Sequence, residues 1–457
     1  MRSIRTRFIA AALATGLAGQ VHASVATLKA GASRVDITPS ASELPQGYDG
    51  VHDPLFVRAL ALDNGVTRAV LVTVDFGAIG PEVWKDVSAY ASSELRVPAA
   101  QLLITATHTH SSGRQPTRRQ MDGMREAVRR AFDALQPAHV AHGVGESYIN
   151  VNRNIIDPKT RRWWEGPNRA GPSDKSVAVV YVHSPDGKPI AVYYNYAVHA
   201  VLLGQLDRIS ADLPGAASAY IEESLGDGAI ALWSEGAAGD QNPIYFQQTY
   251  DLREIRIRDH AKRGIDISNA MPPGGQGLDR KDPQVIKLMR QQERMALSMG
   301  QMLGEEVLYV IRNTLERPEA SAEIFGAQSS VTCPGRKRTD AGRAGYPGTY
   351  VDADPVSIRL SLLTIGSIAI GGVDGEVFNP IAQRLKKESP FKRTIMATLT
   401  NGVARSGYIP HDAAFSQHTF EVVSSSLKPG CAESGIVNGL LDLMDQSLAA
   451  KKQADSR

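Results

Sequence analysis

Two histidines separated by one residue are the strongest chemical signal in the sequence. Residues 107–113, THTHSSG, follow an apolar run at 102–106 that has the character of a buried strand. Residues two apart in a strand face the same side, so His108 and His110 are expected to project together. The carboxyl edge of an α/β sheet is where ligands bind. Zinc accepts neutral imidazole nitrogen, which makes the pair a candidate metal site; the alternative is a pair of hydrogen-bonded surface histidines.

A third histidine strengthens the metal hypothesis. His199 ends another strand-like run at 190–198, and three histidines would leave one zinc position open to water, as in catalytic sites. Taken alone, His199 is better explained as a half-buried core residue. The small residues of 234–243, SEGAAGDQNP, follow a buried strand and would let a backbone approach a ligand, although a tight turn is the preferred interpretation of this segment taken alone.

Several other routes to catalysis lack their motifs. The sequence contains no Gly-x-Ser-x-Gly, so a serine triad of the α/β-hydrolase type is unsupported. It also lacks His-Glu-x-x-His, a Walker loop and a Gly-x-Gly-x-x-Gly after a strand, which argues against zincin proteases and nucleotide cofactors. The formal net charge of +2 argues against nucleic acid as the main partner.

The elements that must position these residues alternate between strand and helix. This alternation predicts an α/β fold with a large mixed β-sheet core and flanking helices. Two segments are expected to be irregular: 245–282, interpreted as a long loop or lid, and the Gly-, Arg- and Pro-rich stretch 333–354. The expected strands are 34–37, 56–63, 69–75, 102–107, 177–183, 190–198, 230–233, 358–365 and 367–372, and the expected helices are 81–95, 118–135, 214–225, 286–315, 378–387 and 434–451.

The N-terminus has the features of a secretory signal peptide. Three arginines precede an apolar run at 8–17, and Val-His-Ala at 21–23 forms a small-x-small cleavage site. The apolar run is too short to span a bilayer, and the alternative is an uncleaved anchor. We therefore expect one domain at 24–457, periplasmic or secreted, with no transmembrane segment in the mature protein. Cys333 and Cys431 are the two cysteines, and either one disulfide or two free thiols fits the sequence.

Short motifs in a fixed order resemble the catalytic domain of the neutral/alkaline (non-lysosomal) ceramidase family. The resemblance covers roughly residues 28–430, and the order of the motifs makes it specific. The motifs are AGASRVDITP at 30–39, ATHTHS at 106–111, Asn152-Arg153, AVH at 197–199, AGD at 238–240, Gly375-Glu376, and Asn401-Gly402 followed by Gly407-Tyr408.

The resemblance implies one catalytic Zn²⁺ and a set of residues around it. The implied ligands are His108, His199, Glu376 and Tyr408. His110 would act as general base and acid or as an oxyanion donor, because its ordinary pKa of about 6.5 suits proton transfer near neutrality. Arg153 would bind the substrate or the developing negative charge.

Two departures from the family put ceramide itself in question. The resemblance implies a serine two positions before Ala-Gly-Asp, where this chain has Gly236, and it implies an immunoglobulin-like C-terminal domain for which the residues after 430 leave no room. Backbone amides of the turn at 236–239 are a candidate oxyanion hole. Three functions stay open: a zinc-dependent hydrolase of a small-molecule or lipid-like acyl amide or ester, a genuine neutral ceramidase, and a zinc-containing binding protein without turnover.

Overall fold

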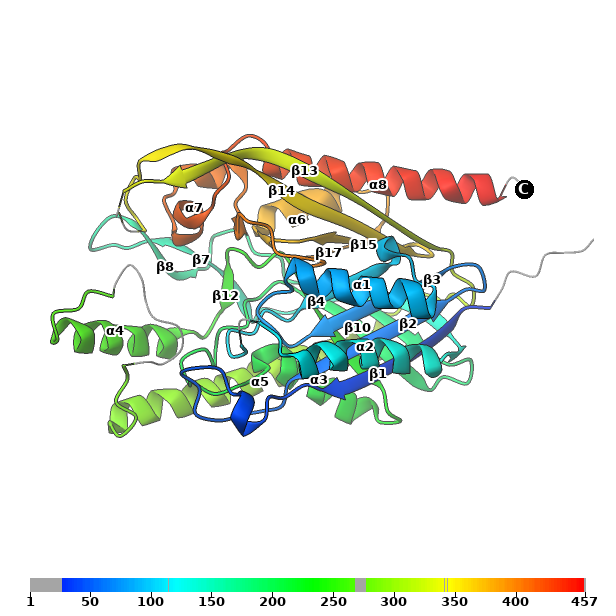
Figure 1. Ribbon diagram of the computed structural model, residues 1–457, viewed down its shortest axis with the longest axis horizontal. Helices are drawn as coiled ribbons and strands as arrows, with labels where there is room; N and C mark the ends of the chain where they lie inside the picture. The colour runs from blue at the N-terminus through cyan, green and yellow to red at the C-terminus, as the bar shows by residue number, and fades with distance from the viewer. Residues whose placement is uncertain (1–26, 114, 268–276, 341, 343, 456–457) are drawn as a thin grey trace, which may run out of the picture.

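The computed structural model describes residues 27–113, 115–267, 277–340, 342 and 344–455 (Figure 1). The signal peptide expected at 1–23 lies outside this part of the chain. Among the helices that the structure describes, none combines the length and the apolar character that a membrane crossing requires.

The first sheet has five strands and carries two helices on its outer face. Its order is β4-β3-β2-β1-β5, and β3 and β4 are parallel. Thr117 caps the second helix through a reciprocal capping box with Gln120. The strands are β1 (Lys29–Asp36), β2 (Phe56–Asp63), β3 (Arg68–Val74), β4 (Leu102–Ala106) and β5 (Gln136–Pro137), and the helices are α1 (Pro81–Leu95) and α2 (Arg118–Asp133).

A second sheet has the order β11-β10-β9-β6 and is covered by two further helices, which also pack on each other. Its β10 and β11 are parallel, so both end at the same edge. The strands are β6 (His139–Glu146), β9 (Ser176–His183), β10 (Pro189–Tyr196) and β11 (Ile230–Glu235), and the helices are α3 (Asp212–Leu225) and α5 (Pro283–Asn313).

The third sheet has the order β13-β14-β15-β17, with β15 and β17 parallel. Its outer face is covered by a short helix and by the long helix that runs along the top of Figure 1. The strands are β13 (Ile324–Arg338), β14 (Tyr350–Ile365), β15 (Ile368–Val373) and β17 (Arg393–Ala397), and the helices are α6 (Asn379–Glu388) and α8 (Ala432–Asp455).

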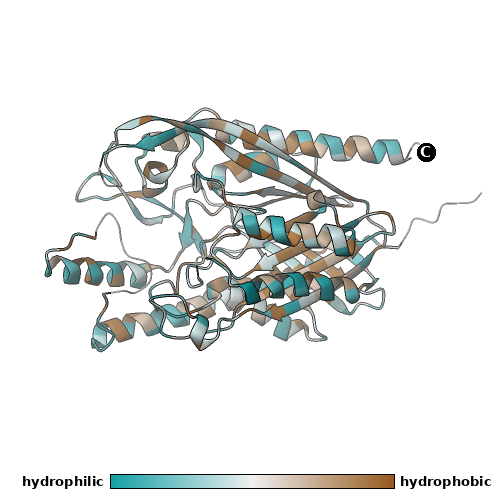
Figure 2. Ribbon diagram, viewed as in Figure 1, coloured by the Kyte–Doolittle hydropathy of each residue, from teal (hydrophilic) through white to brown (hydrophobic). Residues whose placement is uncertain are grey.

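The three sheets share one central core. Leu60 of β2, Tyr193 of β10 and Ile370 of β15 belong to the same fully buried cluster. Figure 2 shows hydrophobic residues concentrated along these central strands, while the covering helices turn hydrophilic residues outward. Burying apolar surface on both faces of each sheet stabilises this arrangement and fixes the strand ends relative to one another. The α/β prediction is confirmed, with the strands divided among several sheets rather than gathered in one.

Two smaller sheets complete the fold near the edge where β4, β10 and β11 end. One has the order β12-β7-β8, and the other is a parallel pair of two-residue strands. The strands are β7 (Asn150–Ile156), β8 (Trp163–Asn168), β12 (Gln241–Pro243), β16 (Glu376–Val377) and β18 (Tyr408–Ile409), and the remaining helices are α4 (Gln247–Ala261) and α7 (Phe420–Ser424), with 3₁₀ turns at Ala41–Glu43, Ala99–Gln101 and Asp412–Ser416.

Both segments expected to be irregular contain regular structure. Most of the first half of 245–282 is helix α4, which buries Leu252 and Ile255 against α5. The apolar stripe is narrow and charged residues surround it, so the sequence pattern of this segment did not indicate a helix. Residues 268–276 of the expected lid lie outside the described residues.

The stretch 333–354 was also interpreted wrongly, because it forms the outer part of the β13–β14 hairpin. A Cβ at Gly335 would lie 2.1 Å from the carbonyl oxygen of Asp354, so this glycine permits the close approach of the two strands. Cys333 of β13 is bonded to Cys431, which decides between the disulfide and the free thiols.

Candidate metal centre

His108 and His110 lie in the loop after β4 rather than in the strand. The strand ends at Ala106, and His108 has a left-handed backbone with a φ of 62°. The strand-alternation argument for their shared direction is therefore wrong. The loop nevertheless brings the two imidazole centroids within 4.9 Å. A non-glycine residue at positive φ is strained, and such strain is tolerated where the surrounding structure holds the residue in place.

The third histidine arrives from the second sheet. His199 follows β10, and its ring centroid lies 4.7 Å from that of His108 and 5.9 Å from that of His110. One ligand atom from each of the three side chains can be chosen so that all lie within 4.8 Å of one another. The structure therefore brings together three histidines from two different sheets.

Backbone carbonyls set the tautomers of two of these histidines. His108 Nδ1 lies 2.7 Å from the carbonyl oxygen of Gly77, and His199 Nδ1 lies 2.7 Å from that of Ala238. A carbonyl oxygen only accepts, so each Nδ1 must carry the donated hydrogen. In the neutral rings, both Nε2 atoms are then left with lone pairs, the arrangement that second-shell partners impose on metal-binding histidines.

Glu376 completes the cluster. Its Oε2 lies 3.2 Å from Nε2 of His108 and 3.2 Å from Nε2 of His199. Burial opposes ionisation of this carboxyl group, but the charge and hydrogen bonds of His108 and His199 in their protonated forms outweigh it and hold its pKa well below the usual range. Burial, followed by the charge of Arg153, lowers the pKa of His199 to about 4, so the ring is neutral at pH 7.

This donor set fits zinc. Two imidazole nitrogens with fixed tautomers each lie 3.2 Å from one carboxylate oxygen, and all three side chains are less than one-fifth exposed. These are the ligand types that zinc takes in catalytic sites.

Tyr408, the fourth expected ligand, is the register partner of Glu376 in the parallel β16–β18 pair. Its ring is roughly parallel to that of His199, at a centroid distance of 6.4 Å. Burial and then the charge of Glu376 raise the pKa of Tyr408 well above its ordinary range. The pairing of β16 with β18 thus explains how a residue 32 positions further along the chain than Glu376 reaches the cluster.

Arg153 is held by other protein groups at every nitrogen of its guanidinium. Nε donates to Glu421 Oε1 at 2.5 Å, one terminal nitrogen to Asn242 Oδ1 at 3.2 Å, and the other to the carbonyl oxygen of Gly239 at 2.9 Å. The guanidinium carbon lies 5.5 Å from the centroid of the Tyr408 ring. Arg153 therefore borders the cluster as a buried, anchored cation.

His110 differs from the other two histidines because it is exposed to solvent. Its backbone is fixed by a hydrogen bond from its N–H to the carbonyl oxygen of Ala200 at 3.0 Å. Enough protein surrounds the ring for loss of hydration to lower its pKa well below the usual range, and His108 and His199 lower it further. The ring is therefore neutral at pH 7 and reachable by a substrate.

The backbone amide of Gly236 is not available to the candidate oxyanion hole at 236–239. Its N–H donates to the carbonyl oxygen of Tyr196 at 2.9 Å, and the N–H of Gly239 donates to that of Val377 at 2.9 Å. Neither amide is free to form an oxyanion hole. A Cβ at Gly236 would lie 2.9 Å from the backbone nitrogen of Ala197, so the glycine is required by the packing of this turn against the end of β10.

Several polar residues near the centre were missed in the sequence. Glu421 pairs with Arg153, and Asn242 bridges Arg153 to Glu165, which it contacts at 2.8 Å. Asp240 accepts from the backbone N–H of Asn379 at the start of α6. Only Asp240 and Asn242 belonged to a noted motif; Glu421 and Glu165 stand in segments without any pattern that separates them from surface acids.

Comparison with known proteins identifies the fold. No protein-family model matches the chain. In sequence it is similar to neutral ceramidase B of Dictyostelium discoideum, with 24% identity over 254 residues that cover 49% of this chain and 35% of that protein. The chain thus matches about a third of the length of this relative.

Two solved structures agree with that similarity. A ceramidase complexed with C2 superposes with a TM-score of 0.64 at 16% identity, covering 94% of this chain and 76% of the other. The neutral ceramidase from Pseudomonas aeruginosa superposes with a TM-score of 0.64 at 15% identity, covering 94% and 75%.

Fold and sequence similarity together define a ceramidase-like hydrolase fold. The resemblance to the neutral ceramidase family that the order of motifs predicted is thereby confirmed.

Proposed function

We propose that the protein is an exported, zinc-dependent hydrolase that cleaves an amide or ester bond. The observation that carries the proposal is the convergence of His108 Nε2 and His199 Nε2 on one carboxylate oxygen of Glu376, with both tautomers set by backbone carbonyls. An arrangement of this kind costs free energy through desolvation of its polar groups unless a ligand compensates for it. The ceramidase-like fold supports a hydrolytic use of the site.

His108, His199 and Glu376 would hold the metal, with Tyr408 as the fourth proposed ligand. Zinc in such a site lowers the pKa of a bound water and polarises a carbonyl group. The neutral, exposed ring of His110 would accept a proton from the attacking water and return it to the leaving group. Arg153 would act mainly by positioning, because its guanidinium holds Gly239, Asn242 and Glu421 around the centre.

We propose that the space beside Arg153, which none of the proposed metal ligands lines, receives a small group of the substrate. A pocket of about 180 Å³ lies against Arg153 and Asn242 and is otherwise lined largely by apolar side chains, including Phe246, Tyr250 and Met295. Pockets for drug-sized ligands occupy roughly 300–1,000 Å³, whereas a dry cavity of about 150 Å³ holds one benzene ring. We therefore favour a short acyl or single-ring group over a long acyl chain. Ceramide, which carries a long acyl chain, is the second candidate substrate.

The test is a hydrolysis screen of the mature protein, stripped with a chelator and then reloaded with zinc. The panel contains N-acyl amides and esters of graded chain length together with a short-chain ceramide. We expect turnover only after reloading, and highest for short acyl groups. Efficient ceramide turnover, with kcat/KM above about 10⁴ M⁻¹s⁻¹, would favour the genuine ceramidase.

A control substitution of a distant histidine separates loss of the metal site from general destabilisation of the protein. His108→Ala should abolish turnover, whereas His183→Ala should not, because His183 pairs with the start of β10 at the opposite end of the same sheet. Zinc retention without turnover on any amide or ester would point instead to a binding protein.

A further inference from the structure

The β7–β8 hairpin carries exposed apolar residues at its tip. Trp164 is 48% exposed and Ile156 is 53% exposed. Trp164 is the only tryptophan among the exposed large hydrophobic residues in the part of the chain described. A solvent-exposed tryptophan leaves a large apolar area unburied, and exposed apolar area marks an interaction surface. Ile156 is the register partner of Trp163 rather than of Trp164, so Ile156 and Trp164 project from opposite faces of the ribbon and meet a partner together only where the tip itself inserts.

The same tip is positively charged. Residues 157–164, DPKTRRWW, hold three cations, Lys159, Arg161 and Arg162, and one acid, Asp157. Asp157 accepts the backbone N–H groups of Lys159 and Thr160, so it also shapes the turn. Within the described residues, neither Lys159 nor Arg161 forms an ion pair with an acidic side chain. The cations are therefore available to an external anion.

A second exposed aromatic group extends this surface. The guanidinium carbon of Arg162 lies 3.6 Å from the ring centroid of Tyr346, which is 42% exposed on the β13–β14 hairpin. The adjacent Gly345 donates its N–H to the carbonyl oxygen of His418, and Phe420, close by in the chain, is 54% exposed. The surface thus runs across two hairpins and the start of α7.

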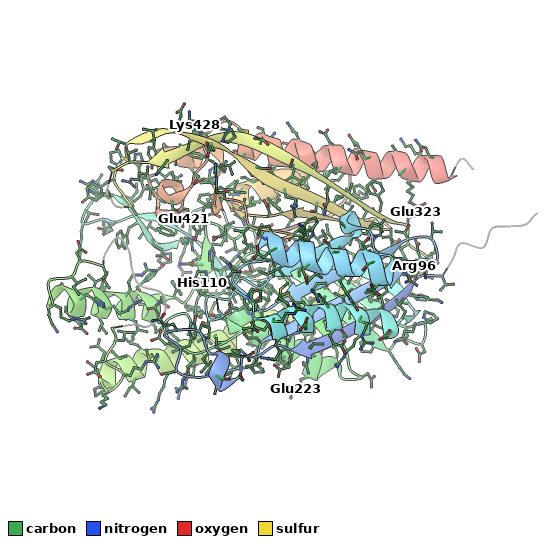
Figure 3. All side chains as sticks on the ribbon, in the orientation of Figure 1. Arg96, His110, Glu223, Glu323, Glu421 and Lys428 are labelled. Carbon is green, nitrogen blue, oxygen red and sulfur yellow. A yellow bond between two sulfur atoms is a disulfide. The ribbon has the colours of Figure 1, made fainter. Side chains whose placement is uncertain are left out.

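The surface lies at the same end of the molecule as the candidate metal centre. The Phe420 ring packs edge-on against the ring of Tyr408 at a centroid distance of 5.8 Å. Figure 1 shows β7, β8 and α7 together at one end, and Figure 3 places Glu421 and His110 toward that end, with Arg96 at the other. A partner on this surface would therefore be held next to the site.

We propose that this end face docks on an anionic lipid surface through Ile156, Trp164 and the cations of the hairpin tip. Tryptophan favours the boundary between headgroups and acyl chains, and nearby lysine and arginine are attracted to anionic lipids. An anionic lipid surface fits this combination of exposed apolar side chains and cations, because its acyl region accepts the apolar side chains and its headgroups attract the cations. The inference does not depend on hydrolysis, because docking is measured without turnover.

The test is co-sedimentation of the mature full chain with vesicles of phosphatidylcholine alone or mixed with phosphatidylglycerol. We expect binding to the anionic vesicles and release by salt. Lys159→Gln and Arg161→Asn should each weaken binding about fivefold, and Trp164→Ser about tenfold. Asparagine is chosen at 161 because the backbone there is left-handed, with a φ of 58°.

Matched controls lie elsewhere on the surface. Tyr309→Ser removes an aromatic side chain that is 52% exposed on α5, and Arg96→Asn removes an exposed cation at the other end of the molecule, from a backbone position that is also left-handed, with a φ of 57°. Both should bind vesicles as the unchanged protein does, and all variants should unfold at the same urea concentration. Equal binding by tip and control variants, no binding to either vesicle, or self-association that the tip variants abolish would each overturn the proposal.

Discussion

Arg153 and Glu421 form a buried ion pair although 268 residues separate them in the sequence. Their side chains are 6% and 2% exposed. The pair ties β7 to α7 beside the candidate metal centre, and the guanidinium also holds the β11–β12 turn through Gly239. Arg153 therefore has a positioning role that its place next to Asn152 in the sequence did not reveal.

The pair makes a prediction about stability. Glu421→Gln and Arg153→Met should each lower the free energy of unfolding by roughly 3–5 kcal/mol, because each leaves the other group buried without its partner. The double variant should lose less than the sum of the two. Urea titration measures all three, with the exposed pair Arg129–Glu126 as a control, where Glu126→Gln should change stability by less than about 1 kcal/mol. Strict additivity at the buried pair would contradict coupling.

The metal ligands make a prediction about zinc content. The reloaded protein should hold close to one zinc per chain by elemental analysis, and His108→Ala, His199→Ala and Glu376→Gln should each lose it. His183→Ala is the control and should retain zinc. Full retention by the two alanine variants at 108 and 199 would eliminate the proposed site.

His110 is expected to affect turnover rather than metal binding. His110→Ala should keep its zinc and lose roughly 10²–10⁴-fold in kcat, the usual range for a general acid–base group. If His110→Ala instead loses zinc to the same extent as His108→Ala, His110 is a ligand and the centre is a three-histidine site, which the proximity of the three rings also permits.

The close packing of Gly236 predicts that a larger residue is not tolerated at this position. Gly236→Ser should lower stability by about 1–3 kcal/mol through overpacking, because the added Cβ would meet the backbone of Tyr196 and Ala197. Zinc retention should fall as well, since Ala197 lies two residues before His199. Gly50→Ser is the control, because a Cβ there meets nothing within 4 Å. A fully stable, zinc-loaded Gly236→Ser protein would show that packing does not require glycine at this position.

His142 makes a prediction about pH. Burial on β6 lowers its pKa to about 4, despite the opposing effect of Glu316. Below its ordinary pKa of about 6.5, the unfolded chain therefore binds a proton that the folded chain does not, so stability falls as pH decreases towards 4. Between pH 7.5 and pH 5, the unchanged protein should lose about 2 kcal/mol more than His142→Gln. Parallel urea titrations that show equal losses would contradict this.

The sequence by itself named the candidate ligands of the proposed centre. His108, His199 and Glu376 were named from motifs, and the order of those motifs predicted the ceramidase-like fold that the comparisons confirm. Most strands and helices were also predictable, because alternation and periodicity of apolar residues reflect burial on one or both faces. These signals are local, so a sequence carries them without knowledge of which segments meet.

Only the tertiary structure decided how these groups meet. His108 lies in a loop and reaches the cluster from a left-handed backbone conformation. Glu376 pairs with Tyr408 across β16 and β18, and Cys333 is bonded to Cys431. The structure also showed that Gly236 serves packing and that Glu421 neutralises Arg153. Each of these relationships joins segments far apart in the chain, and their approach is set by how three sheets pack around one core, which no local pattern encodes.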